Sequence, residues 1–316
     1  MASCEFHRAF FARLTLLALL MQVTATASAD SVLVPVREAP VPAWLIDVPA
    51  TVTDILIAET DAARMHRFVR TRDGIVELDQ RYMSIGTNGA GKKRAWDRRT
   101  PLGVYFITDR LDTSKLHEKY GVAAFPLDYP NAWDRINGRT GYGIWLHGVD
   151  RNSPERPPLD TDGCLALPNE ELLKLTDRLE PWVTPVIVAR EMRWVPPREI
   201  ATLRRDLHAA LEMWRGSLAD GDIMTYLSMY ADEFRYRDMN RADWASYRLS
   251  VFESRPLAGV SLRDVFLVAD PEVPGLYLSR FTQELDTADG PVTTTRRLYW
   301  RHAPGDGWQI VSEDAG

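Results

Sequence analysis

His147 and Cys164 are the two residues whose types and spacing indicate chemistry most directly. A thiol reacts as the thiolate, so a reactive cysteine needs a base nearby, and imidazole accepts a proton near neutral pH. His147 follows an apolar run over residues 143–146 that predicts a strand, and Cys164 follows a polar turn over residues 161–163. We therefore predict a Cys/His nucleophile pair. The alternative is an inert, buried cysteine together with a structural histidine.

The first 29 residues contain the three parts of a secretory signal peptide. Arg8 and Arg13 supply positive charge, residues 14–23 form an apolar run, and small residues ending at Ala29 are typical of a cleavage site. The apolar run is about half of the ~20 residues that a membrane-spanning helix needs, so no stable membrane insertion is expected. The sequence thus predicts an exported protein, located in the periplasm.

Loss of the signal peptide leaves a single cysteine in the mature chain. The sequence has two cysteines, and Cys4 lies within the predicted signal, so Cys164 remains alone. Cysteines in an oxidising compartment usually occur as disulfide partners. A single cysteine there is either a buried inert residue or a reactive thiol, and the polar turn before Cys164 favours the reactive thiol.

The composition is that of a folded protein without general affinity for nucleic acid. Of the 316 residues, 45% are hydrophobic and 26% are charged, which is close to the average for globular domains. The net charge of −6 argues against binding of nucleic acid through a basic surface. The length favours two domains.

Two regions of different character follow the signal peptide. The first is predicted to be mostly β, with short strands over residues 52–58, 67–69, 75–78, 81–86, 103–108, 143–146 and 183–189 and one helix over residues 167–179. In the second, helices over residues 198–218, 223–230 and 241–253 precede strands over residues 260–268, 276–285, 293–301 and 308–312. The predicted organisation is a signal peptide (1–29), an extended lead-in (30–50), a β-rich domain (51–192), a linker (193–197) and an α+β domain (198–316).

The motif around the pair resembles that of the L,D-transpeptidase catalytic-domain family. The resemblance is carried by His147-Gly-Val-Asp, by Thr161-Asp-Gly-Cys164, and by the approach strand Thr100-Pro-Leu-Gly-Val-Tyr105, and it covers about residues 51–190. It implies a β-rich catalytic fold that needs neither a metal nor an organic cofactor. It also implies peptidoglycan stem peptides as the partner, with attack at the diaminopimelate carbonyl and loss of D-alanine.

The resemblance also assigns roles to the residues beside the pair. It implies that Cys164 is the nucleophile and His147 the base, with the imidazole aligned by the backbone carbonyl of Gly148. Backbone N–H groups of Gly163 and Cys164 would then hold the oxyanion, since fixed donors stabilise developing charge best. Trp145, Thr161 and Asp162 flank the pair and are expected to contact substrate.

One residue departs from the family pattern. Many members carry an arginine two residues after the cysteine, where this sequence has Ala166. The change removes a bidentate donor for a carboxylate. Arg135 or Arg139 could replace it. The alternative, which we favour for each of them, is a surface or structural arginine.

The reaction remains open between two outcomes. The aromatic and proline-rich segment over residues 125–134 and the added C-terminal domain resemble a branch of the family that trims stem peptides with water, as a carboxypeptidase. Cross-linking by an amine shares the first half-reaction. A catalytically inactive wall-binding or scaffold protein is the competing class. A serine hydrolase and a zinc enzyme are disfavoured, because neither Gly-x-Ser-x-Gly nor His-Glu-x-x-His occurs.

The C-terminal region resembles the nuclear-transport-factor-like (NTF2-like) cone. The resemblance is carried by Trp214, by the run from Gly221 to Phe234, and by the closing strand from Trp308 to Val311. It implies an α+β domain over residues 198–316 that binds glycan or peptide, or forms a homodimer. Positioning of the substrate is the role we favour.

Overall fold

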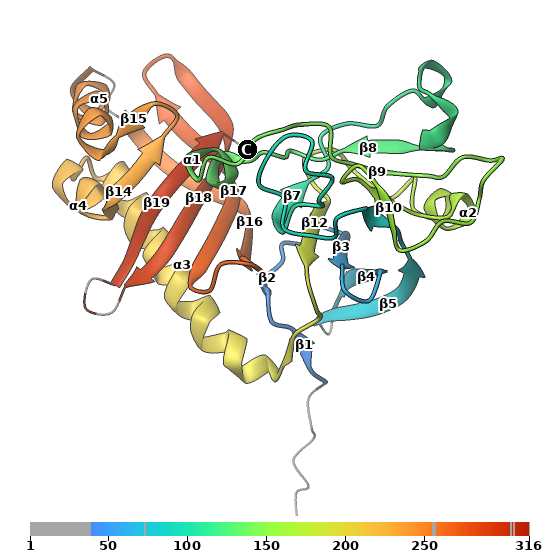
Figure 1. The fold of residues 1–316 in the computed structure, drawn as a ribbon. Helices are drawn as coiled ribbons and strands as arrows, with labels where there is room; N and C mark the ends of the chain where they lie inside the picture. The colour runs from blue at the N-terminus through green and yellow to red at the C-terminus, as the bar shows by residue number, and fades with distance from the viewer. Residues whose placement is uncertain (1–38, 73, 255–256, 304, 306, 316) are drawn as a thin grey trace, which may run out of the picture. The chain divides into compact units, whose positions relative to one another are not determined.

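The computed structural model describes residues 39–72, 74–254, 257–303, 305 and 307–315. The predicted signal peptide and the first part of the predicted lead-in, residues 30–38, lie outside the described residues. Figure 1 shows a strand-rich N-terminal half and a C-terminal half in which helices accompany long strands. Among the described helices, none combines the length and the apolar character needed to cross a bilayer. The fold therefore has the predicted mostly β domain followed by an α+β domain.

A five-stranded sheet forms the centre of the N-terminal half, in the order β5-β4-β3-β12-β7. Its strands are β3 (Asp54–Glu59), β4 (Arg64–Thr71), β5 (Gly74–Tyr82), β7 (Gly103–Phe106) and β12 (Pro185–Ala189). The last strand, β12, lies between β3 and β7; it is parallel to β3 and antiparallel to β7. Because β3 and β12 are buried along nearly their whole length, both read as apolar runs without alternation.

Shorter strands beside this sheet carry the motif residues. The three-stranded sheet β11-β9-β8 is built from β8 (Ala124–Pro126), β9 (Trp145–His147) and β11 (Leu165–Ala166). A parallel pair joins β6 (Ile85–Gly86) and β10 (Leu159–Thr161). The predicted strand over residues 81–86 is therefore divided between the end of β5 and β6.

Helices in this half are short. They are the 3₁₀ turns η1 (Thr113–Lys115) and η2 (Glu118–Tyr120) and the helices α1 (Ala132–Ile136) and α2 (Asn169–Leu173). The predicted helix over residues 167–179 is wrong in length, because the chain after α2 continues as turns. Leu172, Leu175 and Leu179 are buried all the same, so their spacing reports burial rather than a continuous helix.

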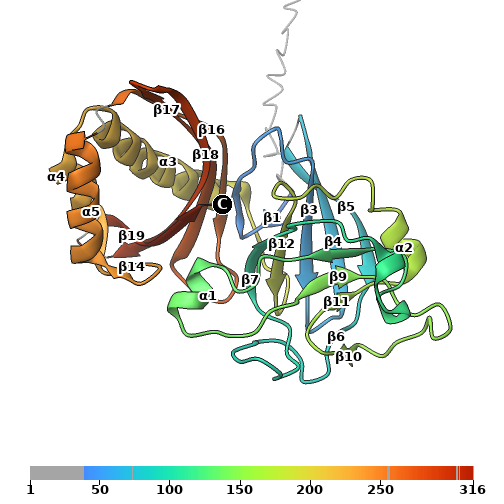
Figure 2. The ribbon, with the colours of Figure 1, turned by 90° about the horizontal axis from the view of Figure 1, so that it is seen from above.

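A seven-stranded sheet dominates the C-terminal half, in the order β15-β14-β19-β18-β17-β16-β2. Its strands after residue 200 are β14 (Tyr230–Tyr236), β15 (Met239–Asn240), β16 (Leu257–Ala269), β17 (Leu276–Thr287), β18 (Gly290–Ala303) and β19 (Gly307–Ala315). Helices α3 (Pro197–Ala219), α4 (Ile223–Ser228) and α5 (Arg241–Ser254) lie along one side of this curved sheet (Figure 2). The predicted helices and four strands are present, and β14 and β15 are additional strands.

The predicted lead-in and linker both contain strands. Within residues 41–47, β1 (Val41–Pro42) pairs with β13 (Trp194–Val195), and β2 (Leu45–Asp47) pairs with β16. The linker thus contains a strand, and α3 begins at Pro197 within it. Proline is accepted at these places because it lies at sheet edges or at the start of a helix, where its missing N–H costs no hydrogen bond.

The two halves share one apolar core. Phe106 of β7 packs edge-on against Phe266 of β16, with ring centroids 6.0 Å apart. Trp133 of α1 stacks on Tyr299 of β18 at 6.5 Å. All four side chains are buried. The C-terminal domain therefore packs against α1 and β7, the elements that lead into the segment before β9.

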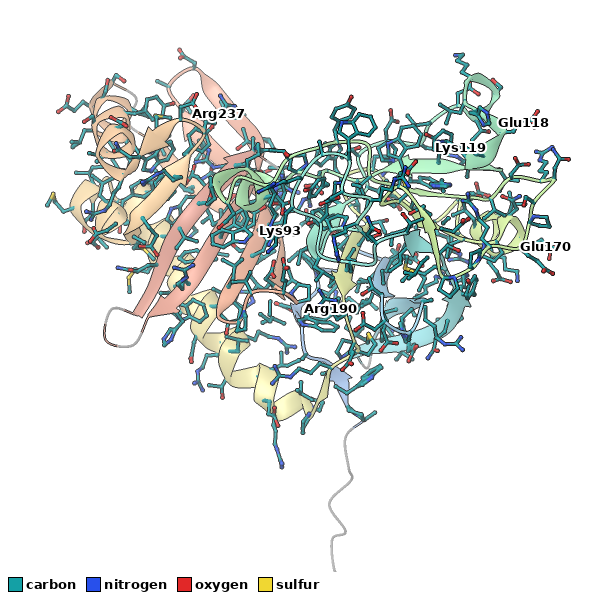
Figure 3. The ribbon with its side chains drawn as sticks, in the orientation of Figure 1. Lys93, Glu118, Lys119, Glu170, Arg190 and Arg237 are labelled. Atoms are coloured by element: carbon teal, nitrogen blue, oxygen red, sulfur yellow. The ribbon has the colours of Figure 1, made fainter. Side chains whose placement is uncertain are left out.

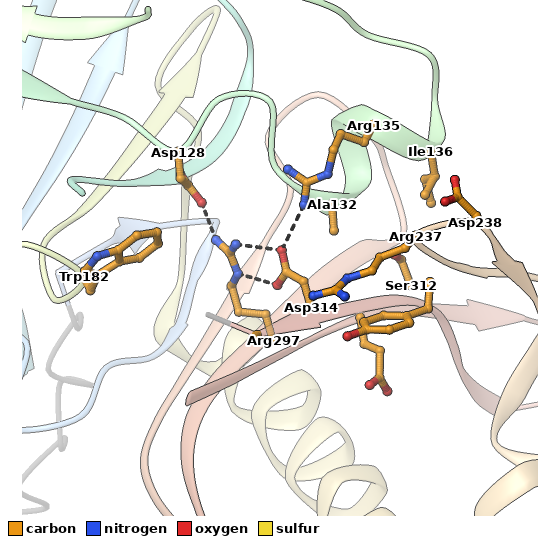
Figure 4. Close-up of a pocket in the computed structure, with 13 residues that line it drawn as sticks. Asp128, Ala132, Arg135, Ile136, Trp182, Arg237, Asp238, Arg297, Ser312 and Asp314 are labelled. Carbon is orange, nitrogen blue, oxygen red and sulfur yellow. Dashed lines mark hydrogen bonds and ion pairs between the residues drawn. The ribbon is translucent and has the colours of Figure 1, made fainter. Parts of the chain in front are cut away.

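A buried arginine adds a polar contact at the same interface. Arg297 of β18 lies between Asp128 of the N-terminal half and Asp314 of β19, and it bonds to both (Figure 4). Asp128 also accepts the backbone N–H of Phe106 at 2.7 Å. These groups line a pocket of about 540 Å³ between the halves.

Replacing Arg297 with methionine is expected to lower the free energy of unfolding by about 3–5 kcal/mol, because Asp128 and Asp314 would keep buried charge without their partner. Urea denaturation followed by tryptophan fluorescence measures the change. The matched control is Arg263→Met, which removes an exposed pair with Glu284 and should cost about 0–1 kcal/mol. Equal losses in the two variants would contradict this account of the interface.

Candidate active site

Two adjacent parallel strands bring His147 and Cys164 to one pocket. In the register of β9 and β11, Leu146 lies opposite Leu165 and His147 opposite Ala166. Cys164 immediately precedes β11. Because side chains alternate along strands, His147 and Cys164 lie on the same face, opposite to that of the two buried leucines. Both line a pocket of about 690 Å³.

The imidazole of His147 is held by its own backbone neighbour. Its Nδ1 lies 2.5 Å from the carbonyl oxygen of Gly148, so Nδ1–H donates and the Nε2 lone pair is left to accept a proton. The ring also packs edge-on against Tyr120, with centroids 5.1 Å apart. The tautomer that a general base needs is therefore fixed by the fold.

Asn169 secures the backbone that follows His147. Its Oδ1 accepts the N–H of Val149 at 3.0 Å, and its Nδ2 donates to the Val149 carbonyl at 2.8 Å. A Cβ added at Gly148 would lie 2.2 Å from Asn169 Oδ1, so only glycine fits there. Asn169, the first residue of α2, therefore braces the backbone whose carbonyl aligns His147.

The turn before Cys164 is held by Thr161. The Thr161 hydroxyl donates to the Cys164 carbonyl at 2.7 Å and accepts the N–H of Gly163 at 3.1 Å. The prediction that Gly163 N–H holds an oxyanion is therefore not met in this geometry, since that donor is already used. Thr161 lines the pocket, but its hydroxyl is likewise committed to the turn rather than to substrate.

The pair is electrically neutral at pH 7. Burial lowers the pKa of His147 to about 4, against the opposing effect of the Gly148 carbonyl. Burial raises the pKa of the Cys164 thiol to about 11, although a backbone hydrogen bond from Trp145 favours the thiolate. Since the thiol holds its proton more tightly than the imidazole, the resting state is thiol and imidazole rather than an ion pair.

Alkylation of Cys164 by iodoacetamide is expected to quicken about tenfold for each pH unit up to about pH 10, because only the thiolate reacts. At pH 8 the folded protein should react on the order of 100-fold more slowly than the urea-unfolded chain, whose thiol has a pKa near ~8.5. Samples quenched at successive times and analysed by intact mass give both rates. A rate that levels off between pH 6 and 8 would instead reveal a thiolate–imidazolium pair.

Arg135 and Arg139 do not take the place of the missing arginine. Arg139 binds Asp134 at 3.1 Å and Glu272 at 2.5 Å, and Arg135 lies 3.7 Å from Asp314. Neither lines the pocket of Cys164. Both therefore belong to the contact with the C-terminal domain, which is the structural alternative and not the replacement of the missing arginine.

Other basic side chains do line the pocket. They are Lys92, Arg98, Lys119 and Arg156. Arg156 lies in the loop over residues 151–160 that precedes the cysteine, and the two arginines of this loop were the signal available in the sequence. Lys119, labelled in Figure 3, lies with its ammonium 5.1 Å from the centre of the Tyr120 ring.

The remaining predicted contacts, Trp145 and Asp162, also line the pocket. Trp145 packs on Tyr120, with ring centroids 4.7 Å apart. Asp162 is an exposed carboxylate 3.7 Å from Arg98. Within the described part of the chain, no group of three or more His, Cys, Asp or Glu side chains is placed to hold a metal ion.

Comparison with known families assigns both halves. Residues 54–188 match the L,D-transpeptidase catalytic domain, and residues 206–314 match the Cds6 C-terminal NTF2-like domain. The chain therefore carries an L,D-transpeptidase catalytic domain followed by a C-terminal NTF2-like domain. The transpeptidase match includes both His147 and Cys164, and the NTF2-like match spans most of α3 and the strands of the C-terminal sheet.

Solved structures share this two-domain fold. Bd1075 from Bdellovibrio bacteriovorus is 23% identical with a TM-score of 0.70, covering 88% of this chain and 99% of that one. The helical cell shape determining protein Pgp2 from Campylobacter jejuni is 24% identical with a TM-score of 0.70, covering 83% of this chain and 91% of that one. No curated protein sequence matches the chain. At these identities the likeness establishes the two-domain fold and not the reaction.

Proposed function

We propose that the protein is an exported, periplasmic enzyme that uses Cys164 to cleave the diaminopimelate–D-alanine bond of peptidoglycan stem tetrapeptides. One observation carries the proposal: Cys164 and His147 line one pocket from the same face of adjacent strands, with His147 Nδ1 bonded to the Gly148 carbonyl. The L,D-transpeptidase catalytic domain supports the substrate class.

The first half-reaction forms a thioester. As Cys164 Sγ bonds to the diaminopimelate carbonyl carbon, His147 Nε2 takes the thiol proton, because the resting pair is neutral. The carbon–nitrogen bond then breaks, and His147 returns the proton to the departing amine of D-alanine. We assign the oxyanion to the backbone N–H of Cys164, since the Gly163 N–H is engaged by Thr161.

The second half-reaction decides between trimming and cross-linking. With water as the nucleophile, His147 accepts its proton, the tripeptide leaves as a carboxylic acid, and the thiol of Cys164 is restored. With an amine, an amide bond forms instead and the products are cross-linked. We favour water. Because the similar protein Pgp2 is a helical cell shape determining protein, we propose that trimming affects cell shape.

Product analysis tests the proposal. The mature chain, residues 30–316, is incubated with purified disaccharide-tetrapeptide, and the products are followed by mass. Tripeptide and free D-alanine are the expected result. Cross-linked or amino-acid-exchanged products would make the protein a transpeptidase, and binding without turnover would support the inactive scaffold that the alanine at position 166 also fits.

A further inference from the structure

We infer that the guanidinium group of Arg156, oriented by Asp160, binds a carboxylate of the stem peptide beside Cys164. The inference rests on the proposed function for the identity of the ligand and deepens it by assigning a specificity residue. It supplies the anchor that Ala166 cannot provide and that Arg135 and Arg139 do not provide.

The geometry of Arg156 leaves donors free for a ligand. Its Nε lies 2.6 Å from Asp160 Oδ2, and its side chain is 20% exposed. Within the described residues its two terminal nitrogens make no hydrogen bond, and its closest ion-pair contact is the one through Nε. Two parallel N–H donors on a planar, partly buried fork fit a carboxylate in bidentate geometry. Asp160 fixes the plane of that fork, so Asp160 is a positioning residue.

Arg156 and the nucleophile are held by one stretch of backbone. The carbonyl of Arg156 accepts the hydroxyl of Tyr82 at 2.7 Å, which secures the loop. Asp160 lies in β10, whose pairing with β6 leads directly into the turn before Cys164. The charge of Arg156 is also close enough to His147 to oppose its protonation. The anchor and the reacting pair therefore have a fixed separation.

The other cations of the pocket are less suited to this task. The ammonium of Lys92 is occupied by Asp97 at 2.8 Å and by a backbone carbonyl at 3.1 Å. Arg98 is 63% exposed and lies near Asp162. Lys119 is exposed and is a point charge without a fork. Arg156 alone among these four combines partial burial with a fixed plane and open donors.

Two carboxylates belong to the residues joined by the bond that is cleaved and are the candidate ligands: that of the terminal D-alanine and that on the side chain of diaminopimelate. Binding of muropeptides to the full-length mature Cys164→Ala protein separates them, using the free acid and two forms that are amidated at one or the other carboxylate. Amidation of the recognised carboxylate should weaken binding about 10- to 100-fold. Amidation of the other carboxylate should change the dissociation constant by less than about threefold, as expected for an exposed contact.

Variants in the Cys164→Ala background identify the residue responsible. Arg156→Gln should weaken binding of the free acid to the level of the amide and leave the amide unchanged. Arg156→Lys and Asp160→Asn should bind the free acid with an affinity between those of the parent and Arg156→Gln, because each keeps the positive charge without the fixed fork. Arg151→Gln, an exposed arginine of the same loop, is the matched control and should match the parent.

The outcomes separate this inference from the proposed reaction. The role of Arg156 as the carboxylate anchor is overturned if Arg156→Gln weakens binding of all three ligands equally or does not weaken it at all. It is also overturned if no muropeptide binds to the parent protein. If discrimination between acid and amide depends on Arg156 but the wild-type protein releases no D-alanine, the anchor is retained and only the proposed reaction is contradicted. Turnover by the wild-type protein without discrimination contradicts the anchor alone.

Discussion

Replacing Cys164 with alanine is expected to lower kcat/KM for release of D-alanine from disaccharide-tetrapeptide by on the order of 10⁴-fold or more. The substitution removes the atom that forms the thioester, and no other cysteine remains in the mature chain if the signal peptide is cleaved as predicted. Release of D-alanine, measured with a coupled oxidase assay, gives the rate. Binding of the muropeptide should survive, because the pocket walls and the basic side chains are unchanged.

A reduced rate has meaning only if the variant keeps its fold. Cys164 is buried, and removing its sulfur should cost the fold far less than a large core truncation. Circular dichroism and urea denaturation of Cys164→Ala provide that check. Release of D-alanine by a well-folded Cys164→Ala protein at more than a tenth of the wild-type rate would mean that the chemistry occurs elsewhere.

Replacing His147 with glutamine is expected to lower kcat by about 10²- to 10⁴-fold, because the variant has no base to take the thiol proton. Wild-type activity should stay nearly constant from pH 8 down to about 5 and fall as pH approaches 4, where His147 becomes protonated. The fall should be absent from the residual activity of His147→Gln. A wild-type profile that falls near pH 6.5 would contradict the buried, neutral imidazole.

The matched control for His147 is a second buried histidine in the same domain. His66 of β4 bonds to Glu59 and Glu77 and lies outside the pocket. His66→Gln should lose stability but retain kcat within a few-fold.

The double variant of Cys164→Ala and His147→Gln should have the same residual rate as Cys164→Ala alone, since the effects of residues that act as a unit are not additive.

The reacting pair could be predicted because its evidence is local. A histidine at the end of an apolar run and a cysteine after a polar turn are visible in the sequence, and parallel pairing of the two strand ends places them in one pocket. The hydrogen bonds around them were harder to foresee. Thr161 uses the Gly163 N–H, and Asn169 braces the backbone after Gly148, because each side chain turns back to a backbone partner.

Long-range partners explain the other differences between expectation and structure. Arg139 reads as a free cation in sequence, but its partner Glu272 lies in the other domain. Residues 45–47 resemble an irregular lead-in, yet β2 completes the edge of a sheet whose neighbouring strand, β16, begins at Leu257. Local patterning of either segment contains no information about a partner so distant, so composition and spacing could not reveal it.

Trapping the acyl-enzyme tests the central claim most directly. Wild-type protein is mixed with excess disaccharide-tetrapeptide, quenched rapidly in acid, and examined by intact mass and peptide mapping. We expect an adduct equal to the muropeptide less D-alanine, located on the peptide that contains Cys164 and absent from Cys164→Ala. Release of D-alanine without such an adduct, or an adduct on another residue, would contradict covalent catalysis by Cys164.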